Sequence, residues 1–366
     1  MKDTLKIIHA ADLHLDSPFQ ALGAEKAALR RSEQRQLLER LCALARERQA
    51  DMLLLAGDLL DTGSVYAETA ASLAAALDGL DCPVFIAPGN HDYYCAASPW
   101  ARLGLPGNVH VFKSPRPECV VLAELGARVW GAAFTQKSAP PPLRGFAAVK
   151  SEGILDIGVF HGEVGRPGSS YGPISEDELA ASGLDYAALG HVHAHGGLLR
   201  AGHTYYAWPG CTEGRGFDEC GEKGALYIEL ERSGGCTAQL VPLAARRYEV
   251  VELDAGAGEL ERRLPDSGGR DICRVILTGQ TESAPDLRRL AELMAPRFFA
   301  FEVQNRTTLA AGIWQRAGED TLRGLFLRRM REQYDAAADG PQRERITQAA
   351  RWGLAALDSG EAVNPL

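Results

Sequence analysis

The sequence has few of the features that mark membrane, secreted or disulfide-linked proteins. No apolar run reaches the roughly 18 residues that a transmembrane helix requires, so we expect no membrane span. No apolar stretch of signal-peptide length follows the first residues, and the eight cysteines are scattered without a C-x-x-C pair. These absences predict a cytoplasmic chain with reduced thiols.

An excess of basic residues is also absent. The formal net charge is -9, which argues against binding of nucleic acid through a basic field over the whole surface. A local basic groove remains compatible with this charge. The composition, with 46% hydrophobic and 24% charged residues, is that of a globular protein with a substantial core. A length of 366 residues then predicts more than one domain.

The first half of the chain alternates short apolar runs with longer amphipathic ones, which indicates an α/β domain. Strands are predicted at 5–10, 52–56, 84–87, 155–160 and 186–189. After residue 245, two apolar runs around a charged stretch predict a small α+β unit, and a helical pattern follows. We therefore predict a main domain at 1–245, a small α+β capping domain at 246–310 and a C-terminal helical segment at 311–366.

Five of these apolar runs end directly at a polar cluster. The clusters are Asp12 with His14, Gly57 with Asp58, Gly89 with Asn90, His91 and Asp92, His161 alone, and Gly190 with His191 and His193. Each cluster alone has an ordinary structural explanation, such as a strand-end turn or a helix N-cap. Ligand sites in α/β proteins collect at the carboxyl ends of strands, so the five clusters together favour one shared site.

The side chains of these clusters suit the hydrolysis of phosphate esters. Two divalent ions about 3.5–4 Å apart require carboxylate oxygens, imidazole nitrogens and one carboxylate that bridges them. Attack by a metal-bound hydroxide places negative charge on the phosphoryl oxygens and on the leaving oxygen. His91 is adjacent to Asn90 and is the candidate for protonating the leaving group or contacting the phosphate.

The clusters resemble the motifs of the calcineurin-like metallophosphoesterase family, over residues 1 to about 245. These motifs occur here in the order D-x-H, G-D-x-x-D, G-N-H-D, a downstream histidine and G-H-x-H. The resemblance implies a four-layer α/β/β/α sandwich, with two mixed sheets and helices outside. It implies that one ion is held by Asp12, His14, Asp58 and His193, and the other by Asp58, Asn90, His161 and His191. Asp61, the second aspartate of G-D-x-x-D, is expected to hold His91 and favour its protonated form. We expect manganese, although iron or zinc also suits this ligand set.

Two segments, 9–16 and the glycine-rich 214–224, resemble a narrower branch, the DNA repair exonuclease group typified by SbcD and the YhaO proteins. That group implies a capping domain followed by helices that dock on a coiled-coil, SMC-like ATPase. Arg215 and Lys223 lie in the second segment and are candidates for contacting substrate phosphates, or else solvated loop charges.

The leading hypothesis from the sequence is a metal-dependent phosphodiesterase acting on DNA, an exonuclease or endonuclease subunit in DNA repair. A homodimer is among the assemblies we consider. A phosphatase or phosphodiesterase for small nucleotides would use the same site and is the first alternative. The second is a subunit that binds DNA or an ATPase with weak catalysis, which the presence of all seven ligands disfavours.

Overall fold

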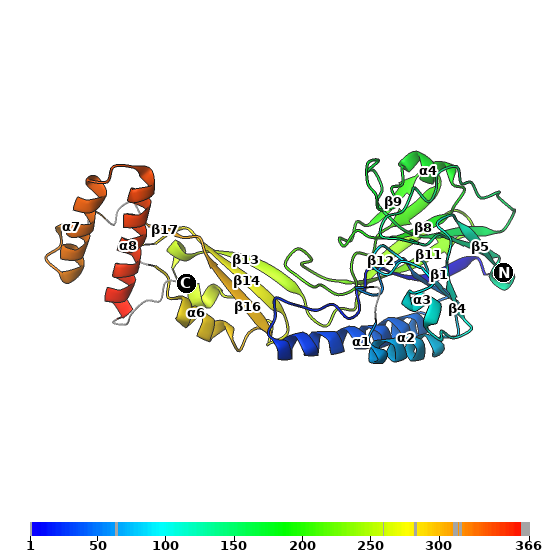
Figure 1. Cartoon of the computed structure of the whole chain (residues 1–366), viewed down its shortest axis with the longest axis horizontal. Helices are drawn as coiled ribbons and strands as arrows, with labels where there is room; N and C mark the ends of the chain where they lie inside the picture. Colours follow the sequence, from blue (N-terminus) through cyan, green and yellow to red (C-terminus); the bar gives the residue numbers. More distant parts are fainter. Residues whose placement is uncertain are drawn as a thin grey trace. The chain divides into compact units, whose positions relative to one another are not determined.

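The computed structural model describes residues 2–62, 65–258, 260–281, 284–309, 314 and 317–359, except for the side chains of residues 309, 355, 358 and 359. The chain divides into two compact units, Met1–Arg247 and Tyr248–Leu366 (Figure 1). Each unit has two sheets and a core of its own, and the units are described separately.

The first sheet of the larger unit contains the apolar runs from the start of the chain. Its order is β12–β11–β1–β2–β3–β4, with β1 to β4 parallel and β11 and β12 each antiparallel to its neighbour. The strands are β1 (Thr4–Ala10), β2 (Met52–Leu55), β3 (Val84–Ile86), β4 (Val109–Val111), β11 (Gly224–Glu231) and β12 (Cys236–Pro242). Every residue of β2 is buried, as expected of a parallel strand that is covered on both faces.

The second sheet of this unit has the order β5–β6–β7–β8–β10–β9. Strands β6, β7, β8 and β10 are parallel, and the outer strands β5 and β9 are antiparallel to their neighbours. The strands are β5 (Glu118–Leu122), β6 (Ala127–Gly131), β7 (Leu155–His161), β8 (Tyr186–Gly190), β9 (Leu198–Ala201) and β10 (Thr204–Ala207). Both β7 and β8 are buried along their whole length.

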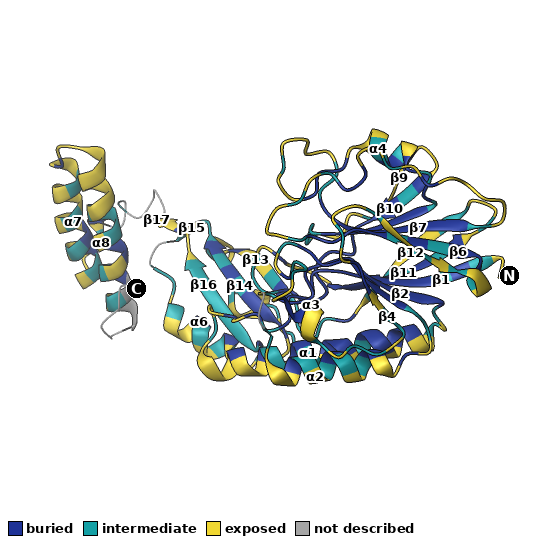
Figure 2. Ribbon diagram, turned by 45° about the vertical axis from the view of Figure 1, so that its right-hand side comes forward, coloured by how far each residue is buried: buried dark blue, intermediate teal, exposed yellow. Residues whose placement is uncertain are grey.

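The two sheets face each other across one core, and helices cover their outer faces. Ile7 of β1 packs in the core between the sheets with Val159 of β7, whereas Ile8 packs on the outer side with Leu41. This alternation follows from the two-residue period of a strand. The helices are α1 (Ala24–Glu47), α2 (Ala67–Asp78), α3 (Pro99–Arg102) and α4 (Glu176–Ala181), with a 3-10 turn η1 (Ala123–Leu125). Figure 2 shows the buried strands and the exposed outer sides of α1 and α2. The expected four-layer α/β/β/α sandwich is confirmed.

The smaller unit begins with a three-stranded parallel sheet in the order β13–β14–β16. Its elements are β13 (Tyr248–Asp254), η2 (Ala255–Ala257), α5 (Leu260–Arg263), β14 (Ile272–Thr278), α6 (Leu287–Met294) and β16 (Ala300–Asn305), with a short pair β15 (Gln280–Thr281) and β17 (Thr308–Leu309). Val275 of β14 and Met294 of α6 are fully buried in its core. Separate domains at 246–310 and 311–366 stay a prediction, and residues 310–313, 315, 316 and 360–366 lie outside the described part.

Two helices, α7 (Leu322–Asp335) and α8 (Gly340–Ser359), follow this sheet. They pack on each other through Leu327 and Leu354. Residues 336–339 separate the two helices. None of the helices in the described part of the chain combines enough length with enough apolar character to span a bilayer.

Candidate metal centre

The five polar clusters all follow the carboxyl ends of strands in the two facing sheets. Asp12 and His14 follow β1, Asp58 follows β2, Asn90 follows β3, His161 ends β7, and His191 and His193 follow β8. His14 lies against His193, and Asp58 lies against His161, so loops from the two sheets meet in one place. The structure therefore brings together all seven side chains that the sequence pointed to.

The backbone at this place adopts conformations that residues with a Cβ rarely take. Asp12, His14, Asp58 and His191 have φ of +52°, +43°, +51° and +89°. Non-glycine residues at positive φ are costly and tend to occur at functional sites, where the surroundings hold them. Gly57 (φ +88°) lies so close to His161 that a Cβ would overlap the imidazole ring. The ligand loops are therefore packed closely against one another.

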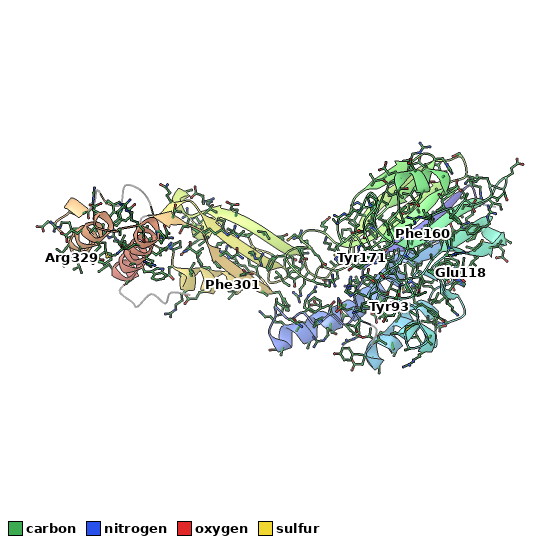
Figure 3. All side chains as sticks on the ribbon, turned by 45° about the horizontal axis from the view of Figure 1, so that its top comes forward. Tyr93, Glu118, Phe160, Tyr171, Phe301 and Arg329 are labelled. Carbon is green, nitrogen blue, oxygen red and sulfur yellow. The ribbon has the colours of Figure 1, made fainter. Side chains whose placement is uncertain are left out.

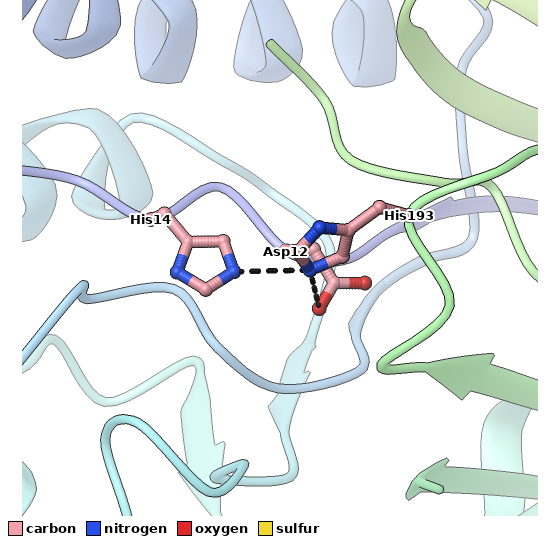
Figure 4. Close-up of side chains that lie close together, drawn as sticks. All are labelled: Asp12, His14 and His193. Carbon is pink, nitrogen blue, oxygen red and sulfur yellow. Dashed lines mark hydrogen bonds and ion pairs between the residues drawn. The ribbon is translucent and has the colours of Figure 1, made fainter. Parts of the chain in front are cut away.

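One half of the centre, which we call the His14–His193 half, consists of Asp12, His14 and His193 (Figure 4). The Nε2 atoms of the two histidines are 3.3 Å apart, and His193 Nε2 is 3.6 Å from Asp12 Oδ1. The Asp12 carboxylate also accepts hydrogen bonds from the backbone N–H of His191 at 3.0 and 3.2 Å. These bonds fix the aspartate between the two sheets.

The other half, the His161–His191 half, consists of Asn90, His161 and His191. Asn90 Oδ1 lies 3.0 Å from His161 Nε2 and 3.1 Å from His191 Nδ1. The two ring nitrogens are themselves 3.3 Å apart. His161 Nδ1 donates to the backbone carbonyl of Ala56 at 2.9 Å, which leaves Nε2 as the nitrogen that faces the centre.

Asp58 lies between the two halves. Its Oδ2 is 3.3 Å from His161 Nε2 and 3.9 Å from His14 Nε2, so one oxygen is close to a ring nitrogen of each half. Its Oδ1 accepts the backbone N–H of His91 at 2.9 Å. The carboxylate is almost fully buried. This is the position that a bridging carboxylate requires.

The surrounding carboxylates give the centre a strong preference for positive charge. Burial alone would lower the pKa of His161, but the Asp58 carboxylate reverses this effect and raises it to about 9. For His193, burial is again outweighed, by Asp12 and Glu219, and the pKa is about 9. The pKa of Asp58 is lowered in spite of its burial, chiefly by His161. Burial lowers the pKa of His14 and of His191, but the carboxylates that stabilise protonated His161 and His193 will also favour cations in place of these protons.

The arrangement of the donors fits divalent ions. Two nitrogens bound to one ion at about 2.0–2.1 Å with a near-tetrahedral angle lie about 3.3–3.4 Å apart. The facing nitrogens are 3.3 Å apart in both halves, in the His14–His193 pair and in the His161–His191 pair. Imidazole nitrogens, carboxylates and one amide oxygen form the mixed donor set that manganese, iron and zinc accept.

His91 and Asp61, the predicted proton-handling pair, lie beside the centre but contact each other differently from the expectation. His91 is exposed, and its Nδ1 donates to the backbone carbonyl of Asp61 at 2.9 Å. The Asp61 carboxylate instead points at His14 Nδ1 and Arg215, at 3.2 Å from each. Asp92 is buried, and its carboxylate accepts backbone N–H groups from two ligand loops, so it fixes these loops in place.

Arg215 and Lys223, the predicted phosphate-binding residues, also lie next to the centre. Lys223 is only 7% exposed, and its Nζ donates to the backbone carbonyl of His193 at 3.2 Å. Arg215 is bound to the carboxylates of Asp61 and Glu219. Both cations therefore contact the protein around His193, instead of extending into solvent as loop charges would.

Three residues near the ligands were not singled out from the sequence. Glu219 Oε1 accepts from His193 Nδ1 at 2.7 Å, and Glu163 Oε1 lies 3.3 Å from His191 Nε2. Tyr171, labelled in Figure 3, stacks on the His191 ring with a centroid separation of 5.2 Å. Glu219 falls in the glycine-rich segment 214–224, and Glu163 follows His161 by two residues. Closeness to a ligand in the sequence could have identified Glu163, and the family-like glycine-rich segment could have identified Glu219, whereas no such signal marks Tyr171.

The chain belongs to the calcineurin-like phosphoesterase family, whose sequence pattern matches residues 5–195. This family is one of metal-dependent hydrolases, whose members bind divalent metal ions. Among curated relatives, the uncharacterized metallophosphoesterase YhaO of Bacillus subtilis is 33% identical over 63% of this chain and 58% of its own length.

Two archaeal relatives are named DNA double-strand break repair protein Mre11. That of Methanopyrus kandleri is 24% identical over 78% of this chain and 68% of its own length. That of Aeropyrum pernix is 27% identical over 69% of this chain and 64% of its own length. The chain thus spans about three fifths to two thirds of the length of these curated relatives.

Proposed function

We propose that this chain is a DNA phosphodiesterase, an exonuclease or endonuclease subunit in DNA repair, that works with two manganese ions. The observation that carries the proposal is the buried Asp58 carboxylate, with one oxygen near a ring nitrogen of each half of the centre. Asp12, His14, Asp58 and His193 would hold one ion, and Asp58, Asn90, His161 and His191 the other. When bound, the ions supply Lewis-acid stabilisation of the phosphoryl oxygens and lower the pKa of water.

His91 is the residue that we propose handles the proton of the leaving group. Its Nδ1 donates to the carbonyl oxygen of Asp61, which can only accept, so Nε2 is the nitrogen left for the substrate. The ring lies edge-on to His14, with centroids 4.9 Å apart, which places it beside the His14–His193 half. An exposed imidazole at this position can reach a bound phosphodiester and protonate the departing oxygen.

DNA is the proposed substrate because two relatives of this chain are named as DNA double-strand break repair proteins. We also propose a coiled-coil, SMC-like ATPase as partner, bound through α7. Leu322 and Leu325 of this helix are 69% and 58% exposed, which leaves apolar surface for a helical partner. Co-purification of the full chain with such an ATPase, and its loss in a Leu322→Glu, Leu325→Glu variant, would support this part.

Cleavage of labelled single- and double-stranded DNA by the purified chain tests the catalytic proposal. We expect cleavage with Mn²⁺ and none with excess EDTA. Asp58→Ala should lower the rate at least about a thousandfold, because the ions contribute several kcal/mol to the transition state and about 1.4 kcal/mol is tenfold. Rapid turnover of a small phosphodiester without DNA cleavage would point to a nucleotide phosphodiesterase instead. Full activity of Asp58→Ala would contradict the metal assignment.

A further inference from the structure

Both histidines of the His14–His193 half have a carboxylate behind them, on the ring nitrogen that faces away from the centre. Glu219 Oε1 accepts a hydrogen bond from His193 Nδ1 at 2.7 Å, and Asp61 Oδ1 lies 3.2 Å from His14 Nδ1 in an ion-pair contact that lacks hydrogen-bond geometry. Carboxylates in this position orient a ligating imidazole and make its other nitrogen a better donor to a metal ion. Neither carboxylate belongs to the set of seven ligands.

A single guanidinium joins the two carboxylates. Arg215 Nη1 donates to Asp61 Oδ1 at 3.2 Å, and Nη2 donates to Glu219 Oε1 at 2.8 Å. Nε and the backbone N–H of Arg215 both donate to Glu219 Oε2, at 3.3 and 2.8 Å. The fork shape of the guanidinium allows this, because its donors point in fixed, different directions.

The side chains of Asp61, Arg215 and Glu219 are largely shielded from water, which strengthens the hydrogen bonds between them. The exposed fractions of the side chains are 4% for Glu219, 17% for Asp61 and 22% for Arg215. Charge-assisted hydrogen bonds are stronger at such sites than at the surface. The His161–His191 half has a weaker counterpart: Glu163 lies near His191, but Arg166, 3.5 Å from Glu163, is 76% exposed. An exposed ion pair of this kind contributes little.

We propose that Asp61, Arg215 and Glu219 form a clamp that holds His14 and His193 in ligating orientation and makes their half of the centre the first to bind a metal ion. The inference rests on the metal centre of the proposed function. It assigns Arg215 as a positioning residue, since Nε, Nη1 and Nη2 each donate to one of the two carboxylates.

Binding of Mn²⁺ to the full chain without substrate tests the clamp. Calorimetric titration, checked by the electron paramagnetic resonance signal of free Mn²⁺, should show two steps in the wild type. Arg215→Ala and Glu219→Gln should each weaken the tighter step by about tenfold or more, the usual effect of removing a partner of a ligand. Arg215→Lys keeps the charge but cannot span both carboxylates, so its loss of Mn²⁺ affinity should be intermediate.

The His161–His191 half provides matched controls. Glu163→Gln should weaken only the weaker step, and Arg166→Ala should change both steps by less than about twofold, because its ion pair is exposed. At saturating Mn²⁺, Arg215→Ala should recover the wild-type KM for a small phosphodiester, as a positioning role requires. A KM that stays raised, with unchanged Mn²⁺ affinity, would overturn the clamp and make Arg215 a substrate-binding residue.

The outcomes separate failure of the clamp from failure of the metal centre. If the wild type binds no Mn²⁺, the proposed function fails. If the wild type binds two ions and Arg215→Ala binds them with the same affinities, only the clamp fails. Far-UV circular dichroism and thermal unfolding in EDTA show whether each variant folds. If Arg215→Ala does not fold, Glu219→Gln and Arg215→Lys decide the question, and unchanged Mn²⁺ affinity in both would overturn the clamp.

Discussion

The two halves of the candidate metal centre present the same kind of facing nitrogen pair but support it in different ways. His161 is the last residue of β7 and pairs with Gly190 of β8, so the sheet itself holds it. Its outer nitrogen bonds to a neutral backbone carbonyl, and Phe134 packs edge-on against the ring. Asn90 then completes this half with an amide oxygen.

The two histidines of the His14–His193 half lie beyond the strand ends. His14 follows the end of β1 by four residues and His193 follows the end of β8 by three, so neither is held by strand pairing. The buried network of Asp61, Arg215 and Glu219 lies behind these loop histidines. A ligand at a strand end, such as His161, is positioned by strand pairing, whereas His14 and His193 have a side-chain network behind them as well as their backbone contacts.

Removal of one ligand from each half is expected to have the largest effect and tests the difference between the two halves. His14→Ala and His161→Ala should each reduce the bound Mn²⁺ from two ions to one and lower phosphodiesterase activity by at least about a hundredfold, since an ion contributes several kcal/mol. Calorimetry should find the tighter step retained in His161→Ala and the weaker step retained in His14→Ala. Loss of both ions in either variant would mean that the halves do not bind independently.

The ligand clusters could be predicted because each directly follows an apolar run. A run such as 52–56 identifies a buried strand, and the residues after it must then lie at the carboxyl edge of the sheet. The return strands β11 and β12 were not predicted, although β11 pairs with β1 at the centre of the first sheet. That pairing joins residues more than 200 positions apart, which no local pattern reports.

The direction of individual side chains was also beyond the sequence. The spacing from Asp58 places Asp61 near the centre, but its carboxylate could face His14, His91 or solvent. In the structure the Asp61 carboxylate faces His14, and in this orientation it also contacts Arg215, which lies 154 residues later in the chain. Glu219 poses the same problem, because its role depends on the fold of the loop that brings it to His193. The contacts among Asp61, Arg215 and Glu219 therefore depend on side-chain rotamers and loop conformations.

A second, smaller effect is expected from the buried aspartate that ties the Asp58 loop to the Asn90 loop. Asp92 is fully buried and accepts the backbone N–H groups of Gly89, Leu59 and Leu60 at 2.8, 2.9 and 3.3 Å. Asp92→Ala leaves these donors without their acceptor, and each such buried group costs about 1–3 kcal/mol. Urea unfolding should show a loss of about 3 kcal/mol or more.

Asp16 offers the matched control, since it ties the loop that carries His14 to the start of α2. Its carboxylate accepts from the backbone N–H of Tyr66 and the hydroxyl of Thr69, but it is partly exposed, so water can replace these partners. Asp16→Asn, which suits the positive φ of +69° at this position, should therefore cost only about 1 kcal/mol. Equal losses in the two variants would mean that the loops of the two halves are tied with equal strength.

The last effect concerns pH dependence and a buried residue that joins the two sheets. His9 of β1 is fully buried, with Nδ1 2.9 Å from the Tyr186 hydroxyl and Nε2 3.2 Å from the Leu189 carbonyl, both on β8. Burial lowers the pKa of His9 to about 3, from 6.5 in an unfolded chain. Between these values the unfolded state binds a proton that the folded state does not, so stability falls as the pH falls.

His9 therefore contributes a slope of about 1.4 kcal/mol per pH unit to the free energy of unfolding below pH 6.5, and none above it. His9→Gln lacks the titrating group, so its stability in EDTA should decline less steeply by that amount. The variant should be about 1–3 kcal/mol less stable than the wild type at neutral pH, because buried hydrogen bonds are lost, and the two curves should converge on acidification. Parallel curves would show that His9 is protonated in the folded chain and donates charge-assisted hydrogen bonds to the Tyr186 hydroxyl and the Leu189 carbonyl.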